Sequence, residues 1–313
     1  MMIMRAPSLH PCHFMRHSRR LIRLLLLVAV ISVPGCESVR DALTPGSPAA
    51  VGPPAANAAI HYSALGASDA LGVGSTAPCQ PFSACPNGTA YTHLLTRDLR
   101  ARSHEVTFVN LGIPTAVLSP AIQEVARAKG RDVPANFIDH ELAFLAPGAT
   151  LVTVLGGAND VNALGHALKQ GAAGDDLKGY IDSQVRAFGA DYDRLIRGIK
   201  SRAPGAFIIV INIPNLAVFP YASGYPLQEK QALQYISVAF TKEANRQAAS
   251  GVVVLDLMCD AAVYDTAKTS SDGFHPNDAG YAYLAQRLLP IVTGSTTAPS
   301  SSCSQMTQVP PLF

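Results

Sequence analysis

The sequence predicts an α/β fold, a three-layer α/β/α sandwich around a five-stranded parallel sheet. Five short apolar segments recur along the chain, and segments of helical length separate them almost without exception. Such alternation is typical of parallel sheets with right-handed crossover connections. The first 57 and the last 21 of the 313 residues lack this pattern.

Each strand is predicted from a short apolar stretch. The first contains Tyr62, Ala64 and Leu65. The other four are rich in β-branched residues and lie at 105–112, 149–157, 206–214 and 251–258. Their nearly continuous apolarity, bounded by Gly and Pro, is typical of strands that are buried on both faces of a sheet.

The intervening segments predict the helices. They lie at 90–103, 116–129, 176–202, 227–249 and 278–289. Residues 58–292 have the length of one α/β domain, and no internal repeat or second domain is found. Residues 293–313 are rich in Ser, Thr and Pro, which predicts an irregular C-terminal tail.

Residues 1–35 predict an export signal. Four arginines between residues 16 and 23 precede an apolar run at 24–33 that only Ser32 interrupts, which is shorter than the roughly 20 residues of a membrane-spanning helix. The segment VPGC at 33–36 resembles a bacterial lipobox, so Cys36 is the predicted lipidation site. Ordinary signal-peptidase cleavage nearby is the alternative. We expect a lipoprotein of the bacterial cell envelope, anchored to a membrane through Cys36.

Residues 36–57 have the composition of a flexible linker, with many Pro, Ala and Gly. The net charge of +2 becomes −3 without the five arginines of residues 1–35, which contain no acidic residue. A faintly acidic chain without a basic stripe excludes the usual electrostatic footprint of nucleic-acid binding. We expect a monomer whose partner is a small-molecule, lipid or glycan ester, for the reasons given below.

Four cysteines follow the predicted lipid site, and an even number in an exported chain favours disulfides. Cys79 and Cys85 bracket a loop that is short enough to close on itself, and Cys259 with Cys303 could hold the C-terminal tail. A zinc site is disfavoured, because the cysteines lack paired close spacings and no histidines cluster near them. No metal is expected.

Polar or glycine-rich motifs follow three of the strands. Ser68 comes after the first strand, Gly112 after the second, and Asn159 after the third. Each of them is also a common turn or capping residue. In open α/β sheets, however, ligands bind at the carboxyl ends of the strands.

The loop SDGFHPN at 271–277 contains Asp272 and His275, three residues apart. This spacing lets the carboxylate accept a hydrogen bond from one imidazole nitrogen while the other nitrogen faces outward. A serine hydroxyl needs such a base to become a nucleophile, and imidazole, with a pKa of about 6.5, suits this task. The other eight histidines lie in the signal or lack an acid three residues before them.

The motifs GASDALG, NLGIP, GGAND and DGFHPN, in this order, resemble the four blocks of the GDSL, or SGNH, hydrolase family of serine esterases and lipases. The resemblance covers residues 60–289 and implies a flavodoxin-like fold. It implies that Ser68 is the nucleophile, His275 the general base and Asp272 the acid that orients it. No cofactor is implied.

The same resemblance implies an oxyanion hole made by the backbone N–H groups of Ser68 and Gly112 and by the side-chain amide of Asn159. One departure is visible. Ala67 occupies the position of the family's aspartate before the serine, and Asp69 follows the serine instead. This departure affects the expected substrate range more than the triad.

The predicted function is hydrolysis of carboxylic esters through an acyl-enzyme. A short-chain carboxylesterase or carbohydrate O-deacetylase needs a shallow pocket, whereas a lipase or lysophospholipase needs an apolar groove. The apolar and aromatic segment 215–227 is the candidate wall of such a groove. A non-catalytic envelope binding protein is the alternative from another class.

Overall fold

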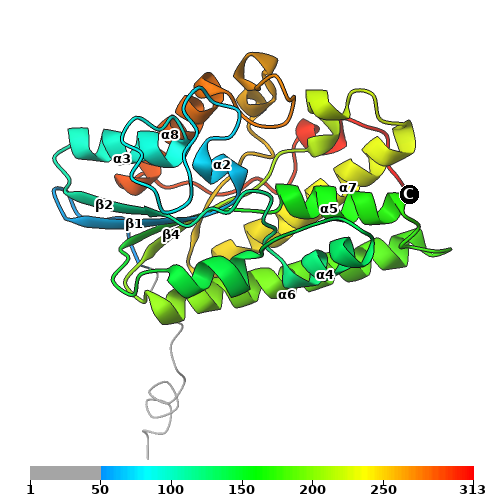
Figure 1. Cartoon of the computed structure of the whole chain (residues 1–313), viewed down its shortest axis with the longest axis horizontal. Helices are drawn as coiled ribbons and strands as arrows, with labels where there is room; N and C mark the ends of the chain where they lie inside the picture. The colour runs from blue at the N-terminus through cyan, green and yellow to red at the C-terminus, as the bar shows by residue number, and fades with distance from the viewer. Residues whose placement is uncertain (1–50) are drawn as a thin grey trace, which may run out of the picture. The chain divides into compact units, whose positions relative to one another are not determined.

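A computed structural model describes residues 51–313 of the chain. Five parallel strands form one sheet in the order β2-β1-β3-β4-β5. Helices cover both faces of this sheet (Figure 1). The predicted three-layer α/β fold is therefore confirmed. No helix within the described residues is long and apolar enough to cross a membrane.

Every predicted strand is present. The first begins two residues before Tyr62, and the other four are shorter than their apolar stretches. The strands are β1 (Ile60–Leu65), β2 (Val106–Asn110), β3 (Leu151–Leu155), β4 (Phe207–Ile211) and β5 (Val253–Leu255). All residues of β3 and β4 are buried. Complete burial explains why the residues of these two strands are all apolar except Thr153, instead of alternating with polar residues.

Seven α-helices accompany the sheet. They are α2 (Ser68–Leu71), α3 (Tyr91–Ala101), α4 (Pro120–Ala128), α5 (Ala158–Lys169), α6 (Leu177–Arg202), α7 (Leu227–Arg246) and α8 (Asp278–Val292). Five of them fall on predicted helical segments. The helix α4 begins four residues later than predicted, because the Ser119 side chain accepts the Ile122 N–H and Pro120 occupies the first helical position.

The helix α5 was not predicted. Its buried residues Val161, Leu164 and Ala167 lie at helical spacing. Gly165 and the asparagines at its start weaken this periodic pattern in the sequence. The helix forms because packing against α4 and α7 supplies the stability that its own residues lack.

The two faces of the sheet carry different helices. Val152 and Val154 of β3 point to the side that α4, α5, α6 and α7 cover. Leu151 and Leu155 of the same strand point to the opposite side, which α3 and α8 cover. Figure 1 shows these two groups of helices on either side of the strands. The two-residue period of a strand therefore divides the core into two layers.

Both predicted disulfides are present. Cys79 is bonded to Cys85, and Cys259 is bonded to Cys303. The second disulfide holds the C-terminal tail, which is irregular except for one 3-10 turn at Ser304–Thr307. Residues 51–57 form no helix or strand and are mostly exposed, as expected for a linker. The predicted signal, Cys36 and the rest of the linker lie outside the described residues.

Candidate active site

Ser68 stands where β1 turns into the short helix α2. It is 6% exposed, and its Oγ lies 2.8 Å from Nε2 of His275. The turn requires Gly66, because a Cβ at this position would lie 2.8 Å from the Cβ of Ala70. Gly72 ends α2 in a left-handed conformation with φ of +80°. The predicted serine is thus placed at the carboxyl edge of the sheet and in contact with the predicted base.

His275 and Asp272 lie in the loop before α8. The Nδ1 atom of His275 is 2.6 Å from Oδ2 of Asp272. The other carboxylate oxygen, Oδ1, accepts hydrogen bonds from the Ser270 hydroxyl and from the backbone N–H groups of Phe274 and His275 at 2.7–2.9 Å. Partial burial acts to raise the pKa of Asp272, but these hydrogen bonds outweigh it and hold the pKa well below its ordinary value.

The other two predicted residues, Gly112 and Asn159, follow β2 and β3. A Cβ at Gly112 would lie 2.9 Å from the carbonyl oxygen of Ala67, so this glycine is packed against the serine turn. Its N–H donates to Oδ1 of Asn110 at 3.1 Å. The Asn159 amide donates one of its two protons to the carbonyl oxygen of Ala116 at 2.9 Å. Its second proton has no partner among residues 51–313.

The chain matches the model of the GDSL-like lipase/acylhydrolase family over residues 64–283. It belongs to this family. The match includes all five residues that the sequence motifs single out, from Ser68 to His275. As a member of the GDSL-like family, the protein is an ester hydrolase. No curated protein matches the chain.

Solved structures of a GDSL-like lipase and of two other lipid hydrolases are similar to this chain. A candidate GDSL-like lipase from Parabacteroides merdae has a TM-score of 0.50 and 18% identity, and covers 77% of this chain and 99% of its own. The extracellular lipase from Streptomyces rimosus has a TM-score of 0.48 and 18% identity, with coverage of 75% and 99%. Phospholipase A1 from Streptomyces albidoflavus has a TM-score of 0.49 and 18% identity, with coverage of 75% and 98%.

Glu141 is a residue at this site that the sequence motifs do not include. It ends a π-helical turn at Phe137–Glu141 and is completely buried. Its Oε2 accepts the Gly66 N–H at 2.9 Å. Burial raises the pKa of Glu141 well above its ordinary value, although the hydrogen bond from the Gly66 N–H acts in the opposite direction. Glu141 therefore holds the serine turn at Gly66, whose carbonyl oxygen accepts the Ile113 N–H at 3.3 Å.

A second buried carboxyl group, that of Asp160, holds the end of the loop that runs from Gly112 to Ser119. The two oxygens of Asp160 accept the backbone N–H groups of Leu118 and Ser119, each at 2.9 Å. Burial raises the pKa of Asp160 to about 7. Asp160 directly follows Asn159 in the first turn of α5, so it couples the start of this helix to the loop that begins at Gly112. A charged residue within GGAND was visible in the sequence, but its partners were not.

Replacement of Glu141 tests its positioning role. We expect Glu141→Gln to keep most of the ester-hydrolysis rate, because the amide retains an acceptor in the same place. Glu141→Leu has a similar size but no acceptor, which leaves a buried N–H unpaired at a cost of about 1–3 kcal/mol. For Glu141→Leu we expect kcat to fall about ten-fold or more, with KM nearly unchanged. Steady-state kinetics with p-nitrophenyl butyrate measures both constants.

Glu124→Leu, at an exposed position of α4, is the matched control for this experiment. Thermal unfolding of each variant separates loss of folded protein from loss of turnover. If Glu141→Gln and Glu141→Leu lower kcat equally, the acceptor atom has no positioning role.

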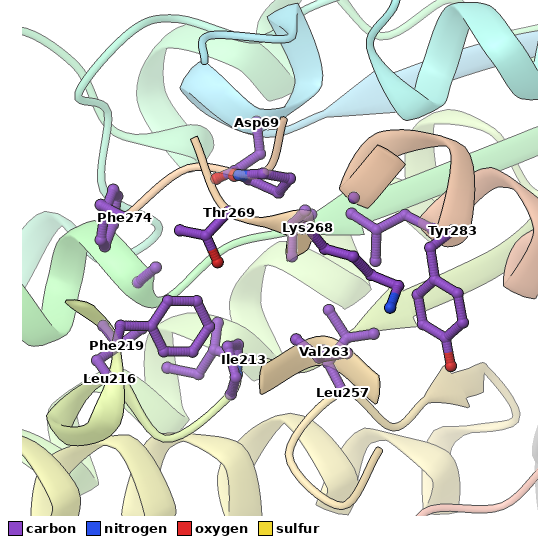
Figure 2. A pocket seen from close by; sticks show the side chains of 16 residues that line it. Asp69, Ile213, Leu216, Phe219, Leu257, Val263, Lys268, Thr269, Phe274 and Tyr283 are labelled. Carbon is purple, nitrogen blue, oxygen red and sulfur yellow. The ribbon is translucent and has the colours of Figure 1, made fainter. Parts of the chain in front are cut away.

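An apolar cavity lies beside the predicted triad. Ile213, Leu257 and Val263 form much of its lining, and Leu216 and Phe219 come from the segment 215–227. Figure 2 shows these side chains around the cavity, with Asp69 on the side opposite Val263 and Leu257. Sequence neighbours of Ser68 and His275 also line the cavity. Asp69 follows Ser68, and Phe274 and Pro276 flank His275.

Asp69, the departure from the family motif, is partly buried at the edge of this cavity. Burial raises the pKa of Asp69, and the charge of His275 opposes this shift. The aspartate therefore faces the cavity and lies near His275, which gives it a different environment from Asp272.

Within residues 51–313, one group of side chains has possible metal ligands close together. The ligand atoms of Cys79, Cys85 and His93 lie within 4.8 Å of one another. The disulfide between the two cysteines occupies both sulfur atoms, so they offer no thiolate to a cation. This group does not fit a metal ion.

Proposed function

We propose that the protein hydrolyses carboxylic esters through a covalent acyl-enzyme, with Ser68 as the nucleophile. The observation that carries this proposal is the unbroken series of hydrogen bonds from Ser68 Oγ through both nitrogens of His275 to Asp272. A serine, a base and an orienting carboxylate in this arrangement are the requirements for nucleophilic catalysis by a hydroxyl group.

In the first step, Ser68 Oγ attacks the ester carbonyl carbon while Nε2 of His275 takes the hydroxyl proton. Asp272 holds the imidazole in the required tautomer and stabilises the imidazolium ion. The carbonyl oxygen becomes an oxyanion, for which Ser68 N–H, Gly112 N–H and the Asn159 amide are the proposed donors. To bind there, the oxyanion replaces Asn110 Oδ1 as the acceptor of the Gly112 N–H, or shares this N–H with it.

The intermediate collapses when the C–O bond to the alcohol breaks. His275 returns the proton to the leaving alcohol oxygen, and the acyl group remains on Ser68. A water molecule then attacks the acyl carbon while His275 takes its proton. Release of the carboxylic acid restores the serine hydroxyl, because the same proton returns to Ser68 Oγ.

The apolar cavity supports a short acyl chain. Its volume is about 70 Å³. This space suits an acetyl or butyryl group and is too small for the chain of a long fatty acid. Of the four substrate types considered, a short-chain carboxylesterase or O-deacetylase therefore fits better than a lipase or lysophospholipase.

A series of p-nitrophenyl esters tests the acyl preference. We expect kcat/KM to be highest between acetate and hexanoate and to fall about ten-fold or more from butyrate to dodecanoate. Leu216→Ala enlarges the cavity, and each methylene that becomes buried contributes about 0.8 kcal/mol. We therefore expect this variant to raise the dodecanoate-to-butyrate ratio about ten-fold.

Val218→Ala is the matched control, because Val218 lies in the same 3-10 turn but does not line the cavity. A wild-type profile that rises steadily with chain length would reverse the assignment in favour of a lipase. An unchanged ratio in Leu216→Ala would show that the acyl group binds elsewhere.

The proposed location is the bacterial cell envelope, after export and lipidation at Cys36. The two disulfides support this proposal, because such bonds persist in oxidising compartments and are rare in the cytosol. The substrate is then an ester that reaches the envelope.

A further inference from the structure

A second hollow, the polar groove, lies between α5, the start of α7 and the loop after α4. Its volume is about 680 Å³, which is much larger than the volume of the apolar cavity. Both charged and aromatic side chains line it. They include Arg131, Asn162, Lys169, Tyr221, Tyr225 and Glu229.

Positive charge is in excess in this groove. Lys169 pairs with Glu229 at 2.6 Å. Arg131 forms no ion pair with a carboxylate among residues 51–313. Its guanidinium donates from Nη1 to the Asn162 carbonyl oxygen at 2.9 Å, which leaves most of its N–H groups available. Arg131 is also partly buried, so water compensates its charge only in part.

The polar groove adjoins the proposed catalytic residues. The Tyr221 hydroxyl donates to Oδ1 of Asn162 at 2.9 Å, and the Tyr221 ring packs edge-to-face on Phe274, with ring centroids 5.1 Å apart. Asn162 lies one turn after Asn159 on α5, about 5 Å along the helix axis. A molecule whose ester oxygen binds at Asn159 can therefore extend along α5 toward the Arg131 guanidinium, which donates to the Asn162 carbonyl oxygen.

We propose that the polar groove binds the alcohol part of the substrate, and that this alcohol carries an anionic group, a phosphate or a carboxylate, which pairs with Arg131. The inference rests on the proposed ester hydrolysis. The apolar acyl group of the ester then occupies the apolar cavity, and its polar alcohol part occupies the polar groove. The planar guanidinium suits both anions, because its parallel N–H groups match two oxygens at once.

Two pairs of esters test the charge preference at constant acyl group. One pair is 1-butyrylglycerol 3-phosphate and 1-butyrylglycerol. The other is 4-butyryloxybutanoate and 4-butyryloxybutanamide. For each pair, the ratio of kcat/KM for the anionic and neutral ester is measured in wild type, Arg131→Gln and Arg102→Gln. Arg102 is exposed at the end of α3, on the opposite face of the sheet, and serves as the control.

We expect a wild-type ratio of about ten or more for at least one pair, because hydrogen bonds between charged groups are the strong ones. The pair with the larger ratio identifies phosphate or carboxylate as the preferred anion. The ratio should fall close to one in Arg131→Gln and stay at the wild-type value in Arg102→Gln. A wild-type ratio near one for both pairs, or a high ratio that persists in Arg131→Gln, would overturn the proposal.

A measurement without turnover separates this inference from the proposed function. Phenylglyoxal labels accessible arginines, and mass spectrometry locates the label in the presence and absence of glycerol 3-phosphate and 4-hydroxybutanoate. We expect one of the two anions to protect Arg131 and neither to protect Arg102. Protection without hydrolysis of any ester would refute the esterase function and keep the anion site. Hydrolysis of esters without protection of Arg131 would refute the anion site alone.

Discussion

Ser68→Ala is expected to abolish ester hydrolysis, with a loss of at least about 10⁴-fold in kcat for p-nitrophenyl butyrate. The methyl group of alanine cannot attack a carbonyl carbon, so only substrate binding and the oxyanion donors remain to assist water. The Ser68 hydroxyl donates to no group other than His275 within the described residues, so the fold should be unaffected. A fluorophosphonate probe should label wild type at Ser68 and leave the variant unlabelled.

Ser63→Ala is the matched control for this variant, because Ser63 lies in β1, is also buried, and forms no side-chain hydrogen bond within residues 51–313. We expect it to keep wild-type turnover. Retained hydrolysis in Ser68→Ala would disprove the acyl-enzyme mechanism. A folded wild type that neither hydrolyses esters nor takes up the probe would favour the non-catalytic binding protein.

Asp272→Asn should lower kcat by up to about 10⁴-fold without changing the fold. Three donors converge on Oδ1, so the side-chain oxygen of asparagine must stay there. Its NH₂ group then replaces Oδ2 and donates to Nδ1 of His275. The imidazole proton is forced onto Nε2, which can no longer accept the proton of Ser68. The wrong tautomer, and not a missing contact, causes the loss.

The pH profile and a second variant distinguish this cause from simple loss of charge. Because hydrogen bonds hold the pKa of Asp272 well below its ordinary value, the carboxylate stays ionised throughout the working range. Titration of Asp272 should therefore contribute nothing to the acid limb of the wild-type rate profile within that range. Asp272→Ala cannot force the tautomer, so we expect it to lose less activity than Asp272→Asn. Equal losses in the two variants would contradict this explanation.

The sheet was predictable because local apolar patterns determine its strands, and the contact between Ser68 and His275 was predictable because their motifs resemble those of a known family. Each strand is a continuous apolar run, and the carboxyl ends of parallel strands lie at one edge of the sheet. Ser68 and Asn159 therefore come near one another although 90 residues separate them in the chain. Asp272 and His275 share a loop, so their spacing alone indicates their hydrogen bond.

The roles of Glu141 and Arg131 and the presence of α5 were not predictable, because contacts distant in sequence determine them. Glu141 lies in an irregular segment, and its contact with Gly66 spans 75 positions. Arg131 resembles any surface arginine until the fold places it against Asn162. The helix α5 has a weak periodic pattern, because its first residues serve the site and its packing supplies the stability. Outside the four family motifs, side-chain partners across long sequence separations follow from the whole fold.

The C-terminal tail supports one wall of the apolar cavity. Asn215, directly before Leu216 of the cavity wall, donates from its amide to the carbonyl oxygen of Gln305, and Gln234 of α7 bonds both the N–H and the C=O of Val309. The residues that support this wall are thus synthesised after the sheet and after the loops that carry Ser68 and His275.

The bond between Cys259 and Cys303 that holds the tail in place spans 44 positions. A loop of this length contributes about 4 kcal/mol in the chain-entropy model. The sheet and the loops that carry Ser68 and His275 are therefore synthesised before this disulfide can secure the cavity wall. In the proposed exported protein, that final step occurs only after the chain has left the cytosol, away from the esters of cytosolic metabolism.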